Sequence, residues 1–174
     1  IRFLYRHFFL DDELPDIDPS AHIPSPKVAV IPGYAPSRDE VKRFLEGPGK
    51  PRDRVLASWV FFTASRRATF SDARWRDIDL DGPNPRWFFV GKGQVVDEVP
   101  LHPQLVRELR KYRNWQQQEA ARNPAIRAAL DHSDTAFVLL TRTGKRVHPN
   151  TIGKMIRWRA IRAGIAVKDA EGTR

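Results

Sequence analysis

Residues 63–100 read TASRRATFSDARWRDIDLDGPNPRWFFVGKGQVVDEVP, and this stretch decides the fold predicted for the chain. Arg66 stands at the start of a short helical pattern. Two runs typical of strands, 87–90 and 95–99, flank Lys92 and its two neighbouring glycines. The glycines tolerate positive φ, so the turn is predicted to project the lysine clear of the sheet. Arg66 and Lys92 thus lie on separate elements and can converge on one anion, with phosphate the first candidate.

Helical patterns surround this stretch on both sides. Ser37 and Glu40 form a capping box that starts a helix. The other predicted elements are a buried helix over 52–63, a short helix over 68–75, helices over 104–121 and 123–130, a short strand over 136–140, and a last helix capped by Asn150 or Thr151 and running to Ala163. The predicted fold class is therefore α+β, mainly helical, with a small antiparallel β-sheet or hairpin that carries Lys92.

The charge of the chain favours a polyanionic partner. The 174 residues carry a net charge of +9, with a pI of about 10.3. Residues 142–174 contain nine Lys or Arg against two acids, whereas residues 1–26 are acidic. A solvated basic surface is the simplest explanation, but a charge concentrated at one end of the chain is typical of a nucleic-acid-binding face.

Several classes of protein and site are excluded or disfavoured. The chain has no cysteine, so it forms no disulfide or thiolate metal site, and this fits a reducing compartment. No apolar run approaches the roughly 20 residues that span a bilayer, and the N-terminus lacks the pattern of a signal peptide. Asp77, Asp79 and Asp81 alternate, but Gly82 comes too early for a calcium loop. The five histidines lack zinc-binding spacing, and no P-loop occurs.

Both ends of the chain have the pattern of an interrupted protein. Residues 1–10 begin within a helical pattern without an initiator Met, and the last residues stop without a closing element. Four prolines within residues 11–26 exclude a continuous helix there. We expect residues 1–26 to be the last helix and exit linker of an upstream domain, and residues 27–174 to be the N-terminal part of the next domain.

The motifs then point to a family. Residues 63–79, TASRRATFSDARWRDID, resemble the first motif of the tyrosine recombinases, the phage integrases and Xer-like enzymes, where the pattern is close to TGLRxSELxxLxWxDID. Residues 90–103, VGKGQVVDEVPLHP, resemble the lysine hairpin of that family, and residues 143–165 resemble the segment before its second arginine. The resemblance extends, in the right order, over nearly the whole chain.

The resemblance implies site-specific DNA recombination or integration through a 3′-phosphotyrosine. Arg66 matches the first catalytic arginine, which stabilises charge on the phosphate, and Lys92 matches the hairpin lysine, which protonates the leaving 5′-oxygen. The resemblance also implies that no metal or nucleotide cofactor is needed and that the partner is double-stranded DNA. The whole protein is expected to act as a homotetramer on DNA. It is expected to be bacterial or phage-encoded and to lie in the cytoplasm, associated with the nucleoid. The cations expected to contact DNA phosphates are Arg142, Lys145, Lys154, Arg157 and Arg159.

The chain departs from the family pattern in four respects. Ala64 and Ser65 replace the usual Gly-Leu before the arginine. Thr69 replaces the usual Glu three residues after the arginine, and Asp97 and Glu98 make one hairpin arm acidic. The HxxR pair and the tyrosine nucleophile are expected beyond Arg174. Tyr112 does not match the nucleophile, because it lies on the apolar stripe of a predicted helix and is expected to pack in the core.

Two other functions remain open. A non-catalytic DNA-binding relic or regulator would keep the fold with an incomplete site. A basic module for RNA or a protein partner would expose aromatic side chains on the sheet, and Trp87-Phe88-Phe89 is the hint for it. Strand alternation predicts that at least one of these aromatic residues faces the core instead.

Overall fold

The computed structural model describes residues 35–91, 95–131 and 135–165. The chain divides into two units, Ile1–Tyr34 and Ala35–Arg174, and all described residues belong to the second. The helix and linker predicted within residues 1–26 lie outside the described residues, as does Lys92. The assignment of the two domains therefore stays a prediction.

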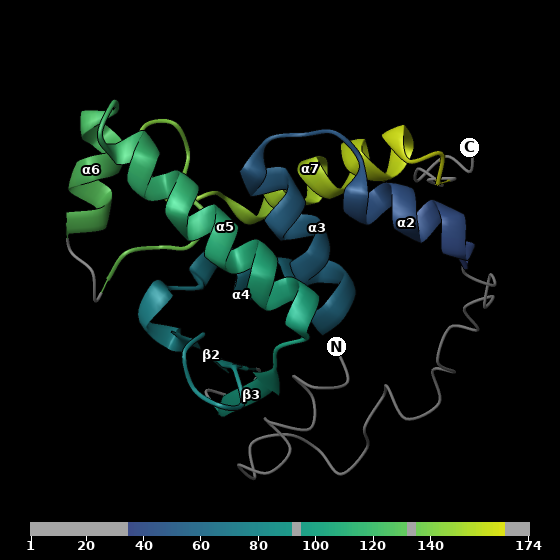
Figure 1. The fold of residues 1–174 in the computed structure, drawn as a ribbon, viewed down its shortest axis with the longest axis horizontal. Coiled ribbons are helices and arrows are strands. Elements are labelled where there is room, and N and C mark those ends of the chain that lie inside the picture. The colour runs from purple at the N-terminus through teal and green to yellow at the C-terminus, as the bar shows by residue number, and fades with distance from the viewer. Residues whose placement is uncertain (1–34, 92–94, 132–134, 166–174) are drawn as a thin grey trace, which may run out of the picture. The chain divides into compact units, whose positions relative to one another are not determined.

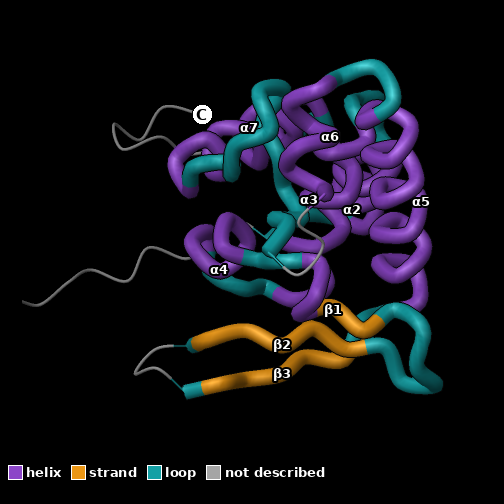
Figure 2. Tube along the Cα trace, turned by 90° about the vertical axis from the view of Figure 1, so that its left-hand side faces the viewer, coloured by secondary structure: helices purple, strands orange, loops and turns teal. Residues whose placement is uncertain are grey.

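The second unit is mainly helical, with one small sheet, as the sequence predicts (Figure 1). Its elements are α2 (Arg38–Glu46), α3 (Pro51–Thr63), α4 (Arg67–Asp72), the 3₁₀ turn η1 (Trp75–Asp77), β1 (Ile78–Asp79), β2 (Arg86–Val90), β3 (Val96–Pro100), α5 (Pro103–Ala120), α6 (Pro124–Asp131) and α7 (Pro149–Arg162). The three strands are antiparallel in the order β1-β2-β3. Figure 2 shows the sheet as a layer beside the helices.

The strands on either side of Lys92 form the predicted hairpin. Trp87 pairs with Val99 and Phe89 with Asp97. The alternation places Trp87 fully in the core while Phe88 is 39% exposed. The third strand, β1, was not predicted, because two residues are too few to show a period of two.

An aromatic cluster joins three elements at the centre of the core. The ring of Trp59 on α3 lies 5.5 Å from Phe70 on α4 and 4.7 Å from Trp87 on β2, centroid to centroid. All three side chains are at most 1% exposed. Because α3 is buried along Val55–Trp59, the prediction of a buried helix is confirmed. The cluster fixes α4 against both α3 and the sheet, which positions the start of α4.

The N-terminal caps of the helices agree only in part with those predicted from the sequence. The capping box of α2 is present, with the Ser37 hydroxyl accepting from the Glu40 amide at 3.3 Å. The predicted cap of α7, Asn150 or Thr151, is wrong. His148 caps this helix, its Nδ1 accepting from the Asn150 amide at 3.2 Å, and Pro149 takes the first helical position, where a missing N–H costs nothing.

Two other elements are shorter than predicted. The helix expected over 68–75 ends at Asp72, and Trp75 lies in η1. The strand expected over 136–140 is reduced to isolated bridges, Arg74 with Phe137 and Leu140 with Arg146. The first of these bridges nevertheless joins the segment after α6 to Arg74, the residue before η1.

The C-cap of α3 carries backbone strain that a single substitution removes. Ala64 adopts φ 47°, and it is the one non-glycine residue with positive φ among those that the structure describes. This conformation costs an alanine about 1 kcal/mol or more. We expect Ala64→Gly to raise the free energy of unfolding by about 1 kcal/mol and the Tm by roughly 2–4 °C, measured by thermal denaturation followed by circular dichroism.

The matched control is Ala128→Gly at an exposed position within α6. There glycine only adds freedom to the unfolded chain, so the variant is expected to lose about 0.5–1 kcal/mol. An Ala64→Gly variant that loses stability like the control would show that the position carries no strain.

Candidate nucleic-acid interface

Arg66 lies at the N-terminus of helix α4, which is held in place by its contacts with the core. It is the N-cap of α4 with extended backbone angles, φ −73° and ψ 150°, and its side chain is exposed. Four residues along, Phe70 enters the aromatic cluster. The buried Ser71 hydroxyl donates to the Val147 carbonyl oxygen at 2.6 Å. The backbone of Arg66 is therefore held by the core while its guanidinium faces solvent.

The hairpin that carries Lys92 lies beside α4. A cavity of about 410 Å³ is lined by Ala68 and Thr69 of α4 and by Val90 and Val96 at the hairpin end. Figure 2 shows the same end of β2 and β3 next to α4. The structure thus brings together the two elements from which Arg66 and Lys92 come. The convergence of the two side chains stays a prediction, because Lys92 is outside the described residues.

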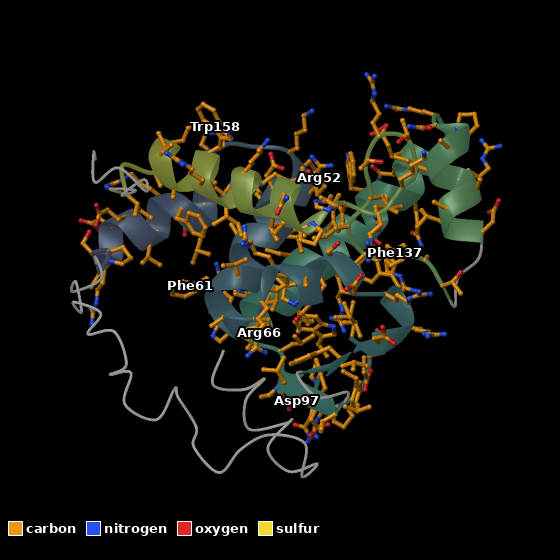
Figure 3. All side chains as sticks on the ribbon, turned by 180° about the vertical axis from the view of Figure 1, so that it is seen from behind. Arg52, Phe61, Arg66, Asp97, Phe137 and Trp158 are labelled. Atoms are coloured by element: carbon orange, nitrogen blue, oxygen red, sulfur yellow. The ribbon has the colours of Figure 1, made fainter. Side chains whose placement is uncertain are left out.

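A pair of arginines around Phe137 was missed by the sequence analysis. The Arg74 guanidinium lies 4.8 Å from the centroid of the Phe137 ring and that of Arg146 lies 5.9 Å from it. Arg146 also forms an ion pair with Asp72 at the end of α4. Phe137 is labelled in Figure 3. No sequence spacing predicts this group, because its members are up to 74 residues apart.

The turn between Leu140 and Arg146 is rigid and presents two of the predicted cations. Gly144 has φ 71°, and a Cβ there would lie 2.2 Å from the Ala125 carbonyl oxygen of α6. The Thr141 amide donates to the Lys145 carbonyl at 2.7 Å, which closes the turn. The side chains of Arg142 and Lys145 are exposed on it. Because only glycine fits at position 144, the backbone that carries these two cations is held in one conformation.

One face of α7 carries two further predicted cations. Lys154 and Arg157 are three residues apart and both exposed. The same exposed face continues to Trp158, 62% exposed, and Ile161, 44% exposed. The face therefore changes from basic to apolar along the helix, and Trp158 lies on the surface (Figure 3).

The fifth predicted cation, Arg159, is not on this surface, which corrects the sequence analysis. Its side chain is 4% exposed. Nε donates to the Phe44 carbonyl, and Nη2 donates to the carbonyls of Leu45 at 2.9 Å and Gly47 at 3.1 Å. Burial lowers the pKa of this guanidinium, and the charge of Asp53 opposes the shift. Arg159 therefore caps the C-terminal end of α2 and is not available to DNA.

Helical periodicity could have identified Arg159 as buried. Ile152, Ile156, Arg159 and Ala163 lie at intervals of four, three and four residues, and each is buried or packed against the core. Arg159 is thus the charged member of an apolar stripe.

Tyr112 packs in the core, as predicted. It is 1% exposed, its ring stacks on Trp115 and its hydroxyl accepts from Gln116 Nε2 at 3.3 Å. Burial raises the pKa of its phenol well above the ordinary value, with Arg52 acting in the opposite direction. A buried phenol that resists ionisation is unsuited to attack a phosphate in DNA.

Within the described ranges, no group of three or more His, Asp or Glu side chains is placed to hold a metal ion. Every helix in those ranges is too short or too polar to span a bilayer.

The sheet offers little aromatic surface on which RNA bases could stack, since Trp87 is buried and Phe89 packs against the core.

Comparison with known proteins gives one curated relative and several solved structures. No model of a known protein family matches the chain. The chain is 28% identical over 174 aligned positions to the tyrosine recombinase XerD of Bifidobacterium longum (strain NCC 2705). The alignment covers 92% of this chain and 53% of the relative, so the chain spans about half the length of that protein.

The solved structures share the fold. The recombinase XerA superposes with a TM-score of 0.63 at 24% identity, over 84% of this chain and 48% of XerA. XerH bound to a palindromic difH substrate superposes with a TM-score of 0.58 at 17% identity, over 76% of this chain and 36% of XerH. An integrase from mycobacterium phage Brujita superposes with a TM-score of 0.55 at 17% identity, over 94% of this chain and 50% of the integrase.

The curated relative aligns with almost the whole chain, and the fold is that of solved recombinases and an integrase. Both findings agree with the motif that contains Arg66. The chain is thus similar in sequence to a tyrosine recombinase, and it shares its fold with solved recombinases and a phage integrase.

Proposed function

We propose that the protein containing this chain cuts and rejoins DNA at specific sites through a 3′-phosphotyrosine, and that this chain supplies part of the phosphate-binding site. The observation that carries the proposal is the place of Arg66. It occupies the arginine position of the family motif, and it is exposed at the head of a helix whose other side is locked into the core.

The proposed chemistry divides between two cations. The tyrosine oxygen attacks phosphorus, a bond forms between them, and the bond from phosphorus to the 5′-oxygen breaks. Arg66 donates to the non-bridging oxygens, where charge grows in the transition state. Lys92 gives a proton to the departing 5′-oxygen. The tyrosine and the second arginine of this mechanism are not assigned to residues of this chain.

The proposed DNA contacts are Arg142 and Lys145 on the rigid turn and Lys154 and Arg157 on α7. All four side chains are exposed. XerH, which shares the fold, was solved bound to its DNA substrate, and this supports a duplex as the partner. Four protomers on two duplexes, in a bacterial cytoplasm, complete the proposal.

Salt dependence tests the phosphate contacts on the chain itself. Each phosphate contact contributes about −0.9 to the slope of log K against log salt concentration. We therefore expect the double variant Lys145→Gln/Lys154→Gln to bind duplex DNA more weakly, with a slope shallower by roughly 2 than the wild type. Fluorescence anisotropy over a salt series measures both quantities.

The control is Arg107→Gln, which removes an exposed cation from α5. Its slope is expected to match that of the wild type. A flat salt dependence for the wild type, or an equal loss of slope in the control, would contradict the proposed surface.

A non-catalytic DNA-binding protein of the same fold is the second candidate. Two observations favour it: Thr69 stands where the family has an acidic residue, and Asp97 and Glu98 are exposed on the hairpin arm, where they repel phosphate. One part of this acidity is compensated, since Glu98 pairs with Arg86 on the neighbouring strand. A parent protein that binds duplex DNA but never forms a covalent adduct would establish this candidate.

A further inference from the structure

A larger cavity lies apart from Arg66, on the side of the molecule where α3 begins and α5 ends. Its volume is about 650 Å³, within the range of pockets that hold small organic ligands. Its walls come from the start of α3, the last turns of α5, the start of α6 and residues 140–142. Figure 3 shows Arg52, one of the lining residues, well separated from Arg66.

The charge of the lining is strongly positive. Lys50, Arg52, Arg122 and Arg142 contribute cations, and Glu119 is the one carboxylate among the lining residues. Several cations around a single cavity repel one another, which raises the free energy of the empty site. An anionic ligand relieves this repulsion, so the cavity favours an anion.

Arg52 is fixed in this wall by a hydrogen bond and an ion pair. Nη1 donates to the Leu140 carbonyl oxygen at 3.1 Å, which anchors the guanidinium across 88 residues of sequence. Nε is buried and makes no hydrogen bond to the described residues, but it forms an ion pair with Asp53 at 3.9 Å. The side chain is 24% exposed. The exposed part of this anchored guanidinium can therefore bind a ligand anion with little further loss of side-chain entropy.

Part of the remaining wall is aromatic and apolar. Trp115 lines the cavity, and its ring is stacked on that of the buried Tyr112 at 5.7 Å with an interplanar angle of 15°. Pro51, Pro124 and Ile126 line it as well. An aromatic wall combined with arginines is the composition that binds bases and phosphates of unpaired nucleic acid.

We propose that this cavity binds a nucleoside phosphate, either free or as an unpaired nucleotide of a DNA strand. The base packs against Trp115, the phosphate pairs with Arg52 and Arg122, and the carboxylate of Glu119 accepts from an amino group of the base. The site is separate from the strand-cleavage site and does not depend on its chemistry. An acidic peptide satisfies the cations but not the aromatic wall, so the lining favours the nucleotide.

Titration of the chain with deoxyadenosine 5′-monophosphate (dAMP), followed by amide NMR shifts, tests the proposal. The expected shifts are confined to residues around the cavity. Trp115→Leu and Arg122→Gln are each expected to weaken binding by about tenfold. Arg52→Gln is expected to do the same, and because it also removes the bond to Leu140, its thermal stability is measured first. Arg107→Gln, on α5 but outside the cavity, is the control and is expected to bind as the wild type.

A strand of eight deoxyadenosines distinguishes the two sources of the ligand. Tighter binding of this strand than of dAMP assigns the site to single-stranded DNA, and the reverse order assigns it to a free nucleotide. The proposal is overturned by any of three results: no shift at about 5 mM dAMP, inorganic phosphate binding as tightly as dAMP with Trp115→Leu unaffected, or a polyglutamate peptide that shifts the cavity residues when dAMP does not.

Discussion

Replacing Arg159 with alanine is expected to lower the free energy of unfolding by about 3–5 kcal/mol, the largest stability loss predicted for this chain. The substitution removes the donor to three carbonyl oxygens at the end of α2, those of Phe44, Leu45 and Gly47. The buried Phe44 carbonyl and the partly buried Leu45 and Gly47 carbonyls then lose this partner. The expected Tm shift is roughly 10 °C downward, measured by thermal denaturation.

The neighbouring Arg162 provides the matched control. It lies three residues away on the same helix and is exposed. Its replacement by alanine is expected to change stability by less than about 0.5 kcal/mol. Arg159→Lys is expected to fall between the two, because a single ammonium group does not reproduce the geometry of the guanidinium fork. Equal stability of the Arg159 and Arg162 variants would contradict the capping role.

Replacing Arg66 with alanine is expected to slow covalent attachment to DNA by on the order of 10²–10³-fold in the whole protein. In the proposed mechanism the guanidinium acts on charge that develops only in the transition state. Binding of the duplex is proposed to rely on many phosphate contacts, so its affinity is expected to change by less than about tenfold. Cleavage of a nicked substrate that traps the adduct measures the first quantity, and fluorescence anisotropy measures the second.

Arg67→Ala is the control for the chemical role of Arg66. The two arginines are adjacent and both exposed, but Arg67 extends toward Gly153 on α7, and the family motif gives it no role. The Arg67 variant is expected to retain cleavage within about tenfold of the wild type. If the Arg66 and Arg67 variants lose cleavage equally, the assignment of the catalytic arginine is wrong.

The sequence predicted the elements whose signals are local. The capping box at Ser37 and Glu40 and the apolar run of α3 each determine structure within one or two turns, and both were found where predicted. The recombinase fold followed from motif resemblance, which carries information on distant contacts that no local pattern contains.

The sequence did not predict features that depend on contacts between distant residues. Its residue type alone predicts that Arg159 lies at the surface. Its role is shown only by its hydrogen bonds to carbonyls of α2, more than 100 residues away. Arg52 reads as an ordinary residue in the first turn of a helix, and its place in a cavity depends on Leu140. Ala64 departs from the glycine of the family pattern, but only the backbone angle shows that the departure is strained.

The most direct test of the proposed function is mass spectrometry of the adduct formed when the whole protein meets a nicked duplex carrying its recombination site. We expect a tyrosine joined to the 3′-phosphate of the cut strand, with a 5′-hydroxyl on the released end and no requirement for a metal ion. An adduct on the 5′-phosphate, or tight duplex binding with no adduct at all, would contradict it.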